Sequence, residues 1–248
     1  MVVSALRGAL GFLTRIPVGT DERAFEAFAE RPVSMPLVGY VIGGFLVIPF
    51  LLPVPSVTSA LLYLIGVYVL TGITHVDGVA DLGDALVVHG DRFRRREVMK
   101  DTTLGTGGTL LVSLVVFGLG AGGFGLASLS EAAVVLVVSA EVGAKAAMAV
   151  LVAAGGVSHR GLGSRIATSP SSRALVPIVL VTAPAALLGW PSIGASAAAV
   201  SASLLSGGLT WYWARTRLGG ISGDVLGATN EIGRVAALHV GVIAWTLS

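Results

Sequence analysis

The chain has 248 residues, of which only 12% are charged, and its mean hydropathy is +0.87, whereas a soluble domain carries about 25% charged residues. This composition excludes an ordinary soluble domain, and the small net charge of +2 gives no reason to expect a nucleic-acid partner. There is no cysteine, so disulfides and thiolate metal sites are excluded.

Long apolar runs follow one another along the chain. Several reach the roughly 17 to 25 residues that cross a bilayer as a helix. We therefore predict an all-α, polytopic integral membrane protein that forms one membrane-embedded domain over residues 1–248. The seven expected spans cover residues 36–52, 58–75, 105–126, 132–154, 174–189, 194–213 and 235–248.

The connections between these spans alternate in character. Those at 53–57, 127–131 and 190–193 are short and join successive spans into hairpins, whereas the others carry nearly all ionisable residues. Only one cation, Lys145, falls inside an expected span, and Arg234 is assigned to the connection before the last one. By the positive-inside rule, the cation-rich connections face the cytoplasm. We therefore expect a multi-pass protein of the cell membrane, in contact with the lipid bilayer, whose active site faces the cytoplasm.

Three aspartates after the second span carry the strongest functional signal. Asp77, Asp81 and Asp84 are spaced i, i+4 and i+7, which places them on one face of a helix. Like charges on one stripe repel each other, and a divalent cation would neutralise them. A solvated helix face with incidental acids is the alternative, but acids are scarce in this chain, and these follow directly after an apolar segment.

Cations and glycines follow the aspartates closely. The cations are Arg92, Arg94, Arg95, Arg96 and Lys100, and they are followed by Asp101, Gly105, Gly107 and Gly108. Carboxylates bind Mg²⁺, while cations and amides at a helix start bind phosphate oxygens. The segment therefore predicts a site for a metal-bound diphosphate. For Arg92, Arg95 and Arg96, anchoring to anionic lipid is at least as good an interpretation.

A glycine-rich segment over residues 219–231 contains Asp224 ahead of an expected helix. One interpretation is that Asp224 caps this helix, because aspartate is common at the N-cap. The other is that the flanking glycines allow a close backbone approach to a ligand or to another helix. The sequence does not choose between them.

Two further groups of polar residues lie near the fourth span. Glu141 and Lys145 are four residues apart inside it, and charges at that depth are costly unless they pair or face a cavity. Pairing is sufficient to explain them, although Lys145 is also long enough to reach the cytoplasmic site. Arg160, after the same span, is placed to contact an anionic group. The four histidines are scattered, which favours oxygen ligands over a zinc site.

Taken in order, these segments resemble the cobalamin synthase (adenosylcobinamide-GDP ribazoletransferase) family. The matching segments are residues 12–18, 35–39, 71–84, 99–108, 160–163 and 223–227. Each is weak alone, but their order and spacing together are specific. The family usually has Ser-Arg after Asp101, where this chain has Thr102 and Thr103. Arg94 or Lys100 would have to replace that arginine.

The resemblance implies the last assembly step of the cobalamin nucleotide loop. α-Ribazole, or its 5′-phosphate, attacks the diphosphate of adenosylcobinamide-GDP, GMP leaves, and adenosylcobalamin, or its 5′-phosphate, forms. Members are Mg²⁺-dependent transferases of the membrane. Mg²⁺ is therefore the expected cofactor, these small molecules are the expected substrates, and residues 1–248 form one transferase domain.

The reaction assigns roles to the residues, because phosphoryl transfer depends mainly on positioning and charge stabilisation. The expected metal ligands are Asp77, Asp81, Asp84 and Asp101. The expected catalytic residues are Asp77, Asp81 and Asp101, the last completing the metal shell or accepting the hydroxyl proton. Substrate or phosphate binding is expected of Arg94, Lys100, Gly105, Gly108, Arg160 and Asp224.

Two other functions fit parts of the pattern. The CDP-alcohol phosphotransferases also combine aspartates and Mg²⁺ on membrane helices. Their signature begins Asp-Gly-x-x-Ala-Arg, and Asp81 stands here in place of that alanine, with no arginine after it. A small-molecule transporter would need polar residues along a path across the membrane, and only Glu141 and Lys145 qualify. A homo-oligomer, the corrin-binding surface, the number of metal ions and the preferred form of α-ribazole stay open.

Overall fold

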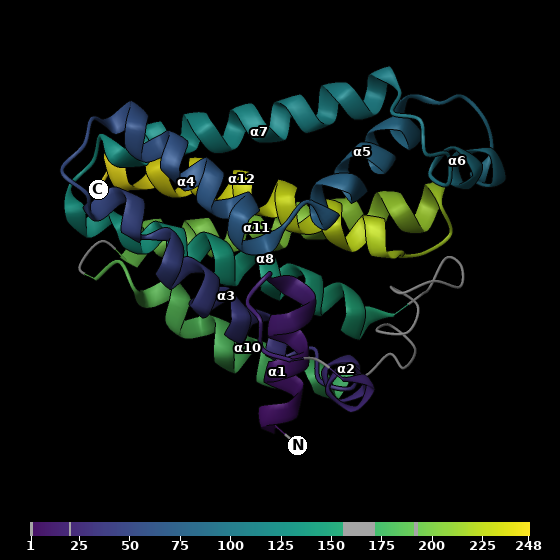
Figure 1. Ribbon diagram of the computed structural model, residues 1–248, viewed down its shortest axis with the longest axis horizontal. Helices are drawn as coiled ribbons and strands as arrows, with labels where there is room; N and C mark the ends of the chain where they lie inside the picture. The colour runs from purple at the N-terminus through teal and green to yellow at the C-terminus, as the bar shows by residue number, and fades with distance from the viewer. Residues whose placement is uncertain (1, 20, 156–171, 191–192) are drawn as a thin grey trace.

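The computed structural model describes residues 2–19, 21–155, 172–190 and 193–248, and every regular element in these ranges is a helix (Figure 1). The all-α prediction is therefore confirmed. The α-helices are α1 (Val2–Leu13), α2 (Glu22–Ala29), α3 (Ser34–Leu46), α4 (Ser56–Thr71), α5 (Thr74–Val87), α6 (Arg92–Val98), α7 (Thr106–Ala127), α8 (Val135–Ala154), α10 (Leu175–Thr182), α11 (Ile193–Arg217) and α12 (Gly223–Thr246). Short 3-10 helices are η1 (Ile48–Leu51), η2 (Glu131–Val134), η3 (Ser172–Ala174) and η4 (Ala183–Leu187).

Several of these helices are long and apolar enough to cross a membrane, which supports a polytopic membrane protein. The four that qualify alone are Ser34–Leu51, Thr106–Ala127, Glu131–Ala154 and Ile193–Arg217. A fifth is reached if α4 and α5, bent by 98° at a short break, count as one span. By length and composition, the described residues thus supply four or five such helices, where the sequence predicted seven.

The differences from the expected spans have local physical causes. The span at 58–75 breaks at Gly72, whose φ of +73° suits a residue without a Cβ atom. The span at 174–189 divides into α10 and η4, and Pro184 in η4 cannot donate the backbone hydrogen bond that would continue the first helix. The last helix starts at Gly223 rather than near residue 235 and carries charged residues.

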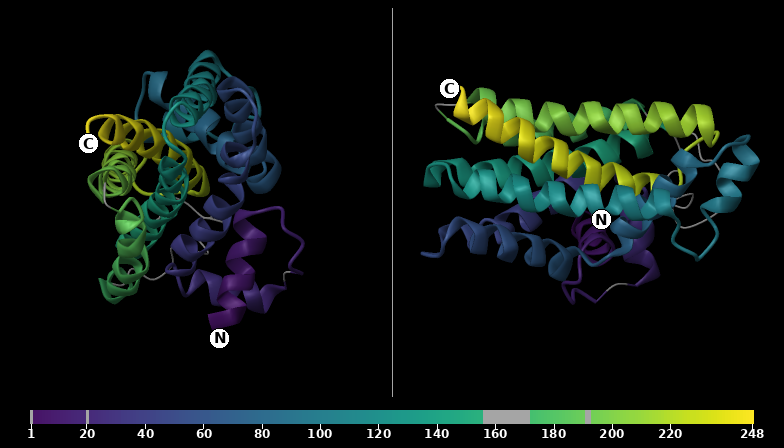
Figure 2. Two further views of the ribbon diagram at one scale, coloured as in Figure 1. Left: turned by 90° about the vertical axis from the view of Figure 1, so that its left-hand side faces the viewer. Right: turned by 90° about the horizontal axis from the view of Figure 1, so that it is seen from above.

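α12 brings several parts of the chain together. It packs against α5, α7, α8 and α11, while α3 packs on α8 and α4 on α7. Figures 1 and 2 show α5 and α6 gathered at one end of the long axis, with the C-terminus at the opposite end. α1 and α2 pack together beside α3. The residues of the expected site on α5, α6 and the start of α12 therefore share one end of the helix bundle.

The distribution of apolar and charged side chains is the reverse of a soluble protein's. Phe117 on α7 and Leu209 on α11 are 77% and 72% exposed, whereas Lys145 and Arg234 are completely buried. In a bilayer, apolar side chains face the lipid, and charged ones face the bundle interior and pair with one another. The exposed apolar surface therefore fits contact with lipid tails.

Candidate active site at the crossing of α5 and α12

The bend between α4 and α5 gives the acidic helix its own direction. Gly72 ends α4, and its φ of +73° turns the chain by 98° before α5 begins. Arg15 fills the space beside the turn, since a Cβ atom on Gly72 would lie 2.9 Å from its Nε atom. The Arg15 backbone amide also donates to the Leu70 carbonyl at 2.7 Å. The N-terminal motif around Arg15 thus supports the segment that presents α5.

α5 carries the three predicted aspartates on one helix. Asp77 is exposed, and Asp81 and Asp84 are half-buried. The electrostatic neighbours of the Asp81 carboxylate are Asp224, Asp77 and Asp84, all of them negative. The prediction that the three acids lie near one another is therefore confirmed. The structure also places a fourth acid, Asp224 of α12, beside them.

Asp84 has a structural function that the sequence did not reveal. Its two carboxylate oxygens accept hydrogen bonds from the backbone amides of Gly105 and Gly108, both at 2.8 Å. These amides lie at the start of α7, where unpaired N–H groups and the helix dipole favour a negative charge. Both amides that the sequence offered to a phosphate are therefore occupied by Asp84 in this structure.

Two glycines let α5 and α12 approach until their backbones touch. A Cβ atom on Gly78 would lie 2.8 Å from the Asp224 Cα atom, and one on Gly227 would lie 3.0 Å from the His75 Cα atom. Small residues permit such close crossings between membrane helices. The glycine motifs of the two segments therefore belong to one helix crossing, with Asp224 beside the acidic face of α5.

Asp224 lies in the first turn of α12, but it is not the cap of this helix. The cap is Ser222, whose hydroxyl oxygen accepts from the Val225 amide at 3.3 Å and whose hydroxyl group donates to Asp224 Oδ2 at 3.2 Å. The capping interpretation of Asp224 is therefore wrong, and the close backbone approach is confirmed. The half-buried carboxylate is directed by Ser222 rather than bound to its own helix.

Asp101 lies apart from this group, in the connection between α6 and α7. Its Oδ1 atom accepts from the Thr103 hydroxyl at 2.7 Å and from the Thr103 amide at 3.0 Å. These bonds, together with the charge of Arg94, hold the pKa of Asp101 below its ordinary value. Thr103, which replaces the family arginine, thus closes a local turn with Asp101.

The basic segment α6 is fixed to the ends of other helices. Arg95 donates to the carbonyls of Ala85 and Leu86 near the end of α5, and Arg96 Nε donates to the Leu218 carbonyl after α11 at 2.6 Å. Cations bind the free carbonyls of helix C-termini favourably. Two of the arginines that lipid anchoring would explain therefore have protein partners.

The remaining predicted cations are less well placed. Arg94 is exposed and pairs with Glu97 at 2.6 Å, and Lys100 is exposed at the same end of the molecule. Arg160 lies outside the described residues. The structure therefore brings Asp77, Asp81 and Asp224 together, but it does not place Arg94, Lys100 or Asp101 in contact with them.

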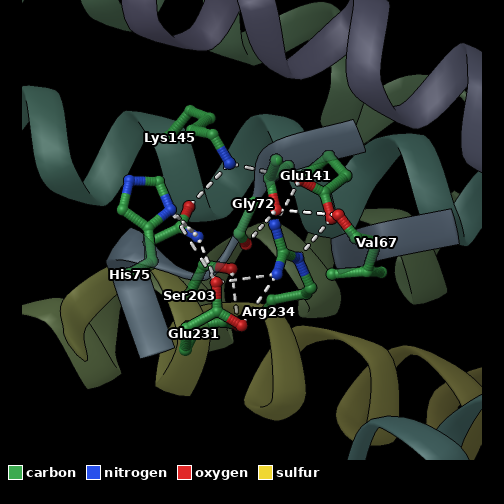
Figure 3. Close-up of polar contacts among 11 residues, drawn as sticks. Val67, Gly72, His75, Glu141, Lys145, Ser203, Glu231 and Arg234 are labelled. Atoms are coloured by element: carbon green, nitrogen blue, oxygen red, sulfur yellow. Dashed lines mark hydrogen bonds and ion pairs between the residues drawn. The ribbon is translucent and has the colours of Figure 1, made fainter. Parts of the chain in front are cut away.

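A network of buried charges joins α8 to α12 (Figure 3). Arg234 of α12 donates to Glu141 of α8 and, through Nη1, to both oxygens of Glu231 at 2.9 and 2.8 Å. Lys145 Nζ lies 3.3 Å from Glu141 Oε2 and donates to Asn230 Oδ1 at 2.7 Å. These side chains are completely buried, and the two acids balance the two bases.

The buried network shows that the predicted position of Arg234 was wrong. It also bears on the alternative that the protein is a small-molecule transporter. Arg234 was assigned to a cytoplasmic connection, but it lies inside α12 and is completely buried. The described buried polar atoms without a partner are Arg7 Nε, Tyr68 Oη and Ser196 Oγ, and none of them belongs to the network. Glu141 and Lys145 are therefore engaged in protein contacts, and the structural pairing expected for them is confirmed.

Sequence reasoning missed Asn230, Glu231 and the inward position of His75. Asn230 Nδ2 lies 3.1 Å from His75 Nδ1 and donates to Glu231 Oε1 at 2.9 Å. A usable signal was present, because Glu231 and Arg234 are three residues apart and would lie on one face of a helix that continued through them. If residues 223–246 had been predicted as one helix, Glu231 and Arg234 would have been predicted as a buried ion pair.

Comparison with known proteins gives one consistent result. The family described as Cobalamin-5-phosphate synthase matches residues 5–242. An adenosylcobinamide-GDP ribazoletransferase from Halorubrum lacusprofundi is 51% identical, covering 99% of each chain, and one from Haloquadratum walsbyi is 46% identical, covering 100% of each. A Pyrococcus abyssi protein of the same name is 32% identical over 95% of this chain and 96% of its own. No solved structure matches the chain. The chain belongs to the cobalamin-5-phosphate synthase family.

Proposed function

We propose that the acidic face formed by Asp77, Asp81 and Asp224 binds the diphosphate of adenosylcobinamide-GDP through Mg²⁺. The chain is an enzyme of cobalamin synthesis, and its relatives are named for this nucleotide. The reaction transfers the adenosylcobinamide-phosphate group to α-ribazole or its 5′-phosphate, releases GMP and forms adenosylcobalamin or its 5′-phosphate. The observation that carries the proposal is the meeting of Asp224 with the acids of α5 at a crossing made by Gly78.

The donor set fits a magnesium ion that is completed by its substrate. Among residues 2–19, 21–155, 172–190 and 193–248, no three His, Cys, Asp or Glu side chains stand close enough to hold a metal by themselves. Mg²⁺ commonly uses one or two carboxylates and fills its shell with waters and substrate phosphates. The negative neighbours of Asp81 favour a cation at this face. No more than two of Asp77, Asp81 and Asp224 would hold the ion directly, and Asp84 would contribute its charge from the start of α7.

The chemistry needs positioning and charge compensation more than covalent help. A ribose hydroxyl oxygen attacks the phosphorus that carries adenosylcobinamide, the bond from this phosphorus to the bridging oxygen breaks, and GMP leaves with that oxygen. Mg²⁺ supplies charge neutralisation on the diphosphate. Asp101 is poorly suited to accept the hydroxyl proton, because its lowered pKa makes it a weaker base and it lies apart from the acidic face.

The orientation of the protein in the membrane follows from the cations around the site. Arg94 and Lys100 in and after α6, and Arg215 and Arg217 at the end of α11, lie at the end of the bundle where α12 begins. By the positive-inside rule this end faces the cytoplasm, where nucleotide substrates are made. We therefore place the protein in the cell membrane with its acidic face on the cytoplasmic side.

The test is a reconstituted reaction. Purified protein in detergent is incubated with adenosylcobinamide-GDP, α-ribazole and Mg²⁺, and the products are separated by chromatography. We expect cobalamin and GMP in equal amounts, and neither when Mg²⁺ is removed by EDTA and left out. A parallel reaction with CDP-diacylglycerol and an alcohol should give no product. CMP release in that reaction would show a phosphotransferase of the other kind.

A further inference from the structure

We propose that Lys145 and Asn230 are positioning residues that lock α5 against α12 through His75. The hydrogen-bonded chain Lys145–Asn230–His75 is called the relay below. The proposal rests on the proposed function for the role of the acids, since the relay holds in register the two helices that carry Asp81 and Asp224. It assigns a function to buried groups that the reaction itself does not use.

Lys145 fixes the orientation of the Asn230 side-chain amide. A lysine ammonium group only donates hydrogen bonds. The Asn230 atom that lies 2.7 Å from Lys145 Nζ must therefore be the oxygen Oδ1. The side-chain nitrogen then points the other way, toward His75 Nδ1 at 3.1 Å and Glu231 Oε1 at 2.9 Å. Both amide hydrogens and the amide oxygen are used, so rotating the amide would break all three contacts.

The Asn230 amide in turn fixes the tautomer of the His75 ring. Because Asn230 Nδ2 donates, His75 Nδ1 has to accept, and the ring proton must be on Nε2. Amide orientation and histidine tautomer are usually ambiguous in a structure. Here a lysine settles both, because it cannot accept a hydrogen bond. Lys145 on α8 thus determines which atom of α5 is bound by α12.

The hydrogen bond between Asn230 and His75 connects two helices that are far apart in the sequence. It joins residues 155 apart in sequence, and it is the only side-chain hydrogen bond between α5 and α12 in the described part of the chain. It lies at the same crossing as the close approach of Gly227 to His75. Glycine surfaces allow two helices to approach, but they are smooth and do not select one rotation or one register. A directional bond between buried partners does select one.

The cost of the network supports a positioning role. Lys145, Arg234, Glu141 and Glu231 are completely buried, and apolar residues of similar size commonly stabilise such a position as well or better. Buried ionic groups are best established where they fix the register of packed helices. Because the relay fixes the crossing at His75, it also fixes how far Asp224 stands from Asp81.

The decisive experiment measures the helix distance directly. The chain contains no cysteine, so cysteines placed at the exposed positions Leu86 on α5 and Ile243 on α12 can carry spin labels for pulsed electron resonance. The variants are His75→Leu, which removes the acceptor, and His75→Asn, which restores an acceptor oxygen near the position of Nδ1. Ser203→Ala is the matched control, because it removes a buried hydrogen bond from α11 to the Gly233 carbonyl without touching α5.

We expect one narrow distance distribution for the unmodified protein, His75→Asn and Ser203→Ala, and a shifted or broadened one for His75→Leu. In the enzyme assay, His75→Leu should raise the Mg²⁺ concentration for half-maximal activity by about tenfold or more, with a smaller change in kcat at saturating Mg²⁺. His75→Asn should restore the Mg²⁺ requirement. An unchanged distance and an unchanged Mg²⁺ requirement in His75→Leu would overturn the relay.

A second measurement uses the unmodified protein and therefore does not depend on whether a variant folds. Nitrogen NMR of the protein labelled with ¹⁵N-histidine should show His75 with an unprotonated Nδ1 and a protonated Nε2, and a protonated Nδ1 would contradict the proposal. The two proposals fail in different ways. Absence of cobalamin formation by the unmodified protein would reject the proposed function, while the distances and the tautomer would still decide the relay.

Discussion

The backbone of Asp224 lies directly against Gly78, so closely that a Cβ atom on Gly78 would come within 2.5 Å of the Asp224 carbonyl oxygen. Neither backbone can move without displacing a whole helix. The first acid of α12 can therefore approach α5 only because Gly78 has no side chain. Asp77 precedes that glycine directly, so the same contact places acids from both helices.

Gly78→Ala should separate the two helices and lower activity strongly. The added methyl group meets backbone atoms, and overpacking of this kind costs about 1–3 kcal/mol. The measurement is thermal unfolding in detergent together with the transferase assay. Gly120→Ala on α7 is the matched control, because a Cβ atom there meets nothing within 4 Å. Equal effects of the two substitutions would contradict the crossing.

Asp81→Asn and Asp224→Asn should each nearly abolish cobalamin formation while the protein still inserts and folds. Each change removes a negative charge from the proposed cation-binding face and leaves the side-chain shape almost unchanged. Initial rates over a range of Mg²⁺ concentrations provide the measurement, with size-exclusion chromatography as the check on folding. Glu131→Gln, an acid-to-amide change on η2 beyond the far end of α7, should keep normal activity. Near-normal rates in both aspartate variants would rule out the metal site.

Asp84→Ala should lower stability more than Asp81→Asn does. It leaves the Gly105 and Gly108 amides without their acceptor, and loss of a helix N-terminal cap costs about 0.5–2 kcal/mol. Chemical unfolding in mixed micelles would compare the two variants. An Asp84→Ala protein as stable as the unmodified one would show that the cap contributes little.

Lys145→Met should destabilise the protein by about 3–5 kcal/mol, because it leaves a buried negative charge without compensation. Adding Glu141→Gln restores a neutral cluster around Arg234 and Glu231, so the double variant should be more stable than the single one. Unfolding free energies of the two single variants and the double variant form the required cycle. Additive losses would mean that the network is not electrically coupled.

The sequence predicted the acidic helix well because that signal is local. The i, i+4, i+7 spacing of Asp77, Asp81 and Asp84 places them on one face whatever the rest of the fold does. The glycine-rich segment at residues 219–231 pointed separately to Asp224, but spacing alone could not connect it with α5. The close approach that joins them depends on Gly78 and Gly227, and their partners are far away in the sequence.

The failures have the opposite character, because each depends on a distant partner. Arg234 was assigned to a loop because the last span was predicted to start at residue 235, and its partner Glu141 is 93 residues away in the sequence. The capping function of Asp84 was not predicted, because the amides that it caps belong to another helix. Arg96 read as a lipid anchor because the Leu218 carbonyl is 122 residues away. Hydropathy and spacing contain no information about such contacts.

The pairing within the buried network also bears on how the chain enters the bilayer. Glu141 and Lys145 are four residues apart on α8, and Glu231 and Arg234 are three apart on α12. Each helix thus contributes one acid and one base, on the same face, to the buried network, and these two charges balance each other within the helix. During synthesis α8 is made well before α12, and its charges can neutralise each other until the last helix arrives. Docking then adds the contact between Glu141 and Arg234, so the assembly joins two pairs that are already balanced instead of burying bare charges.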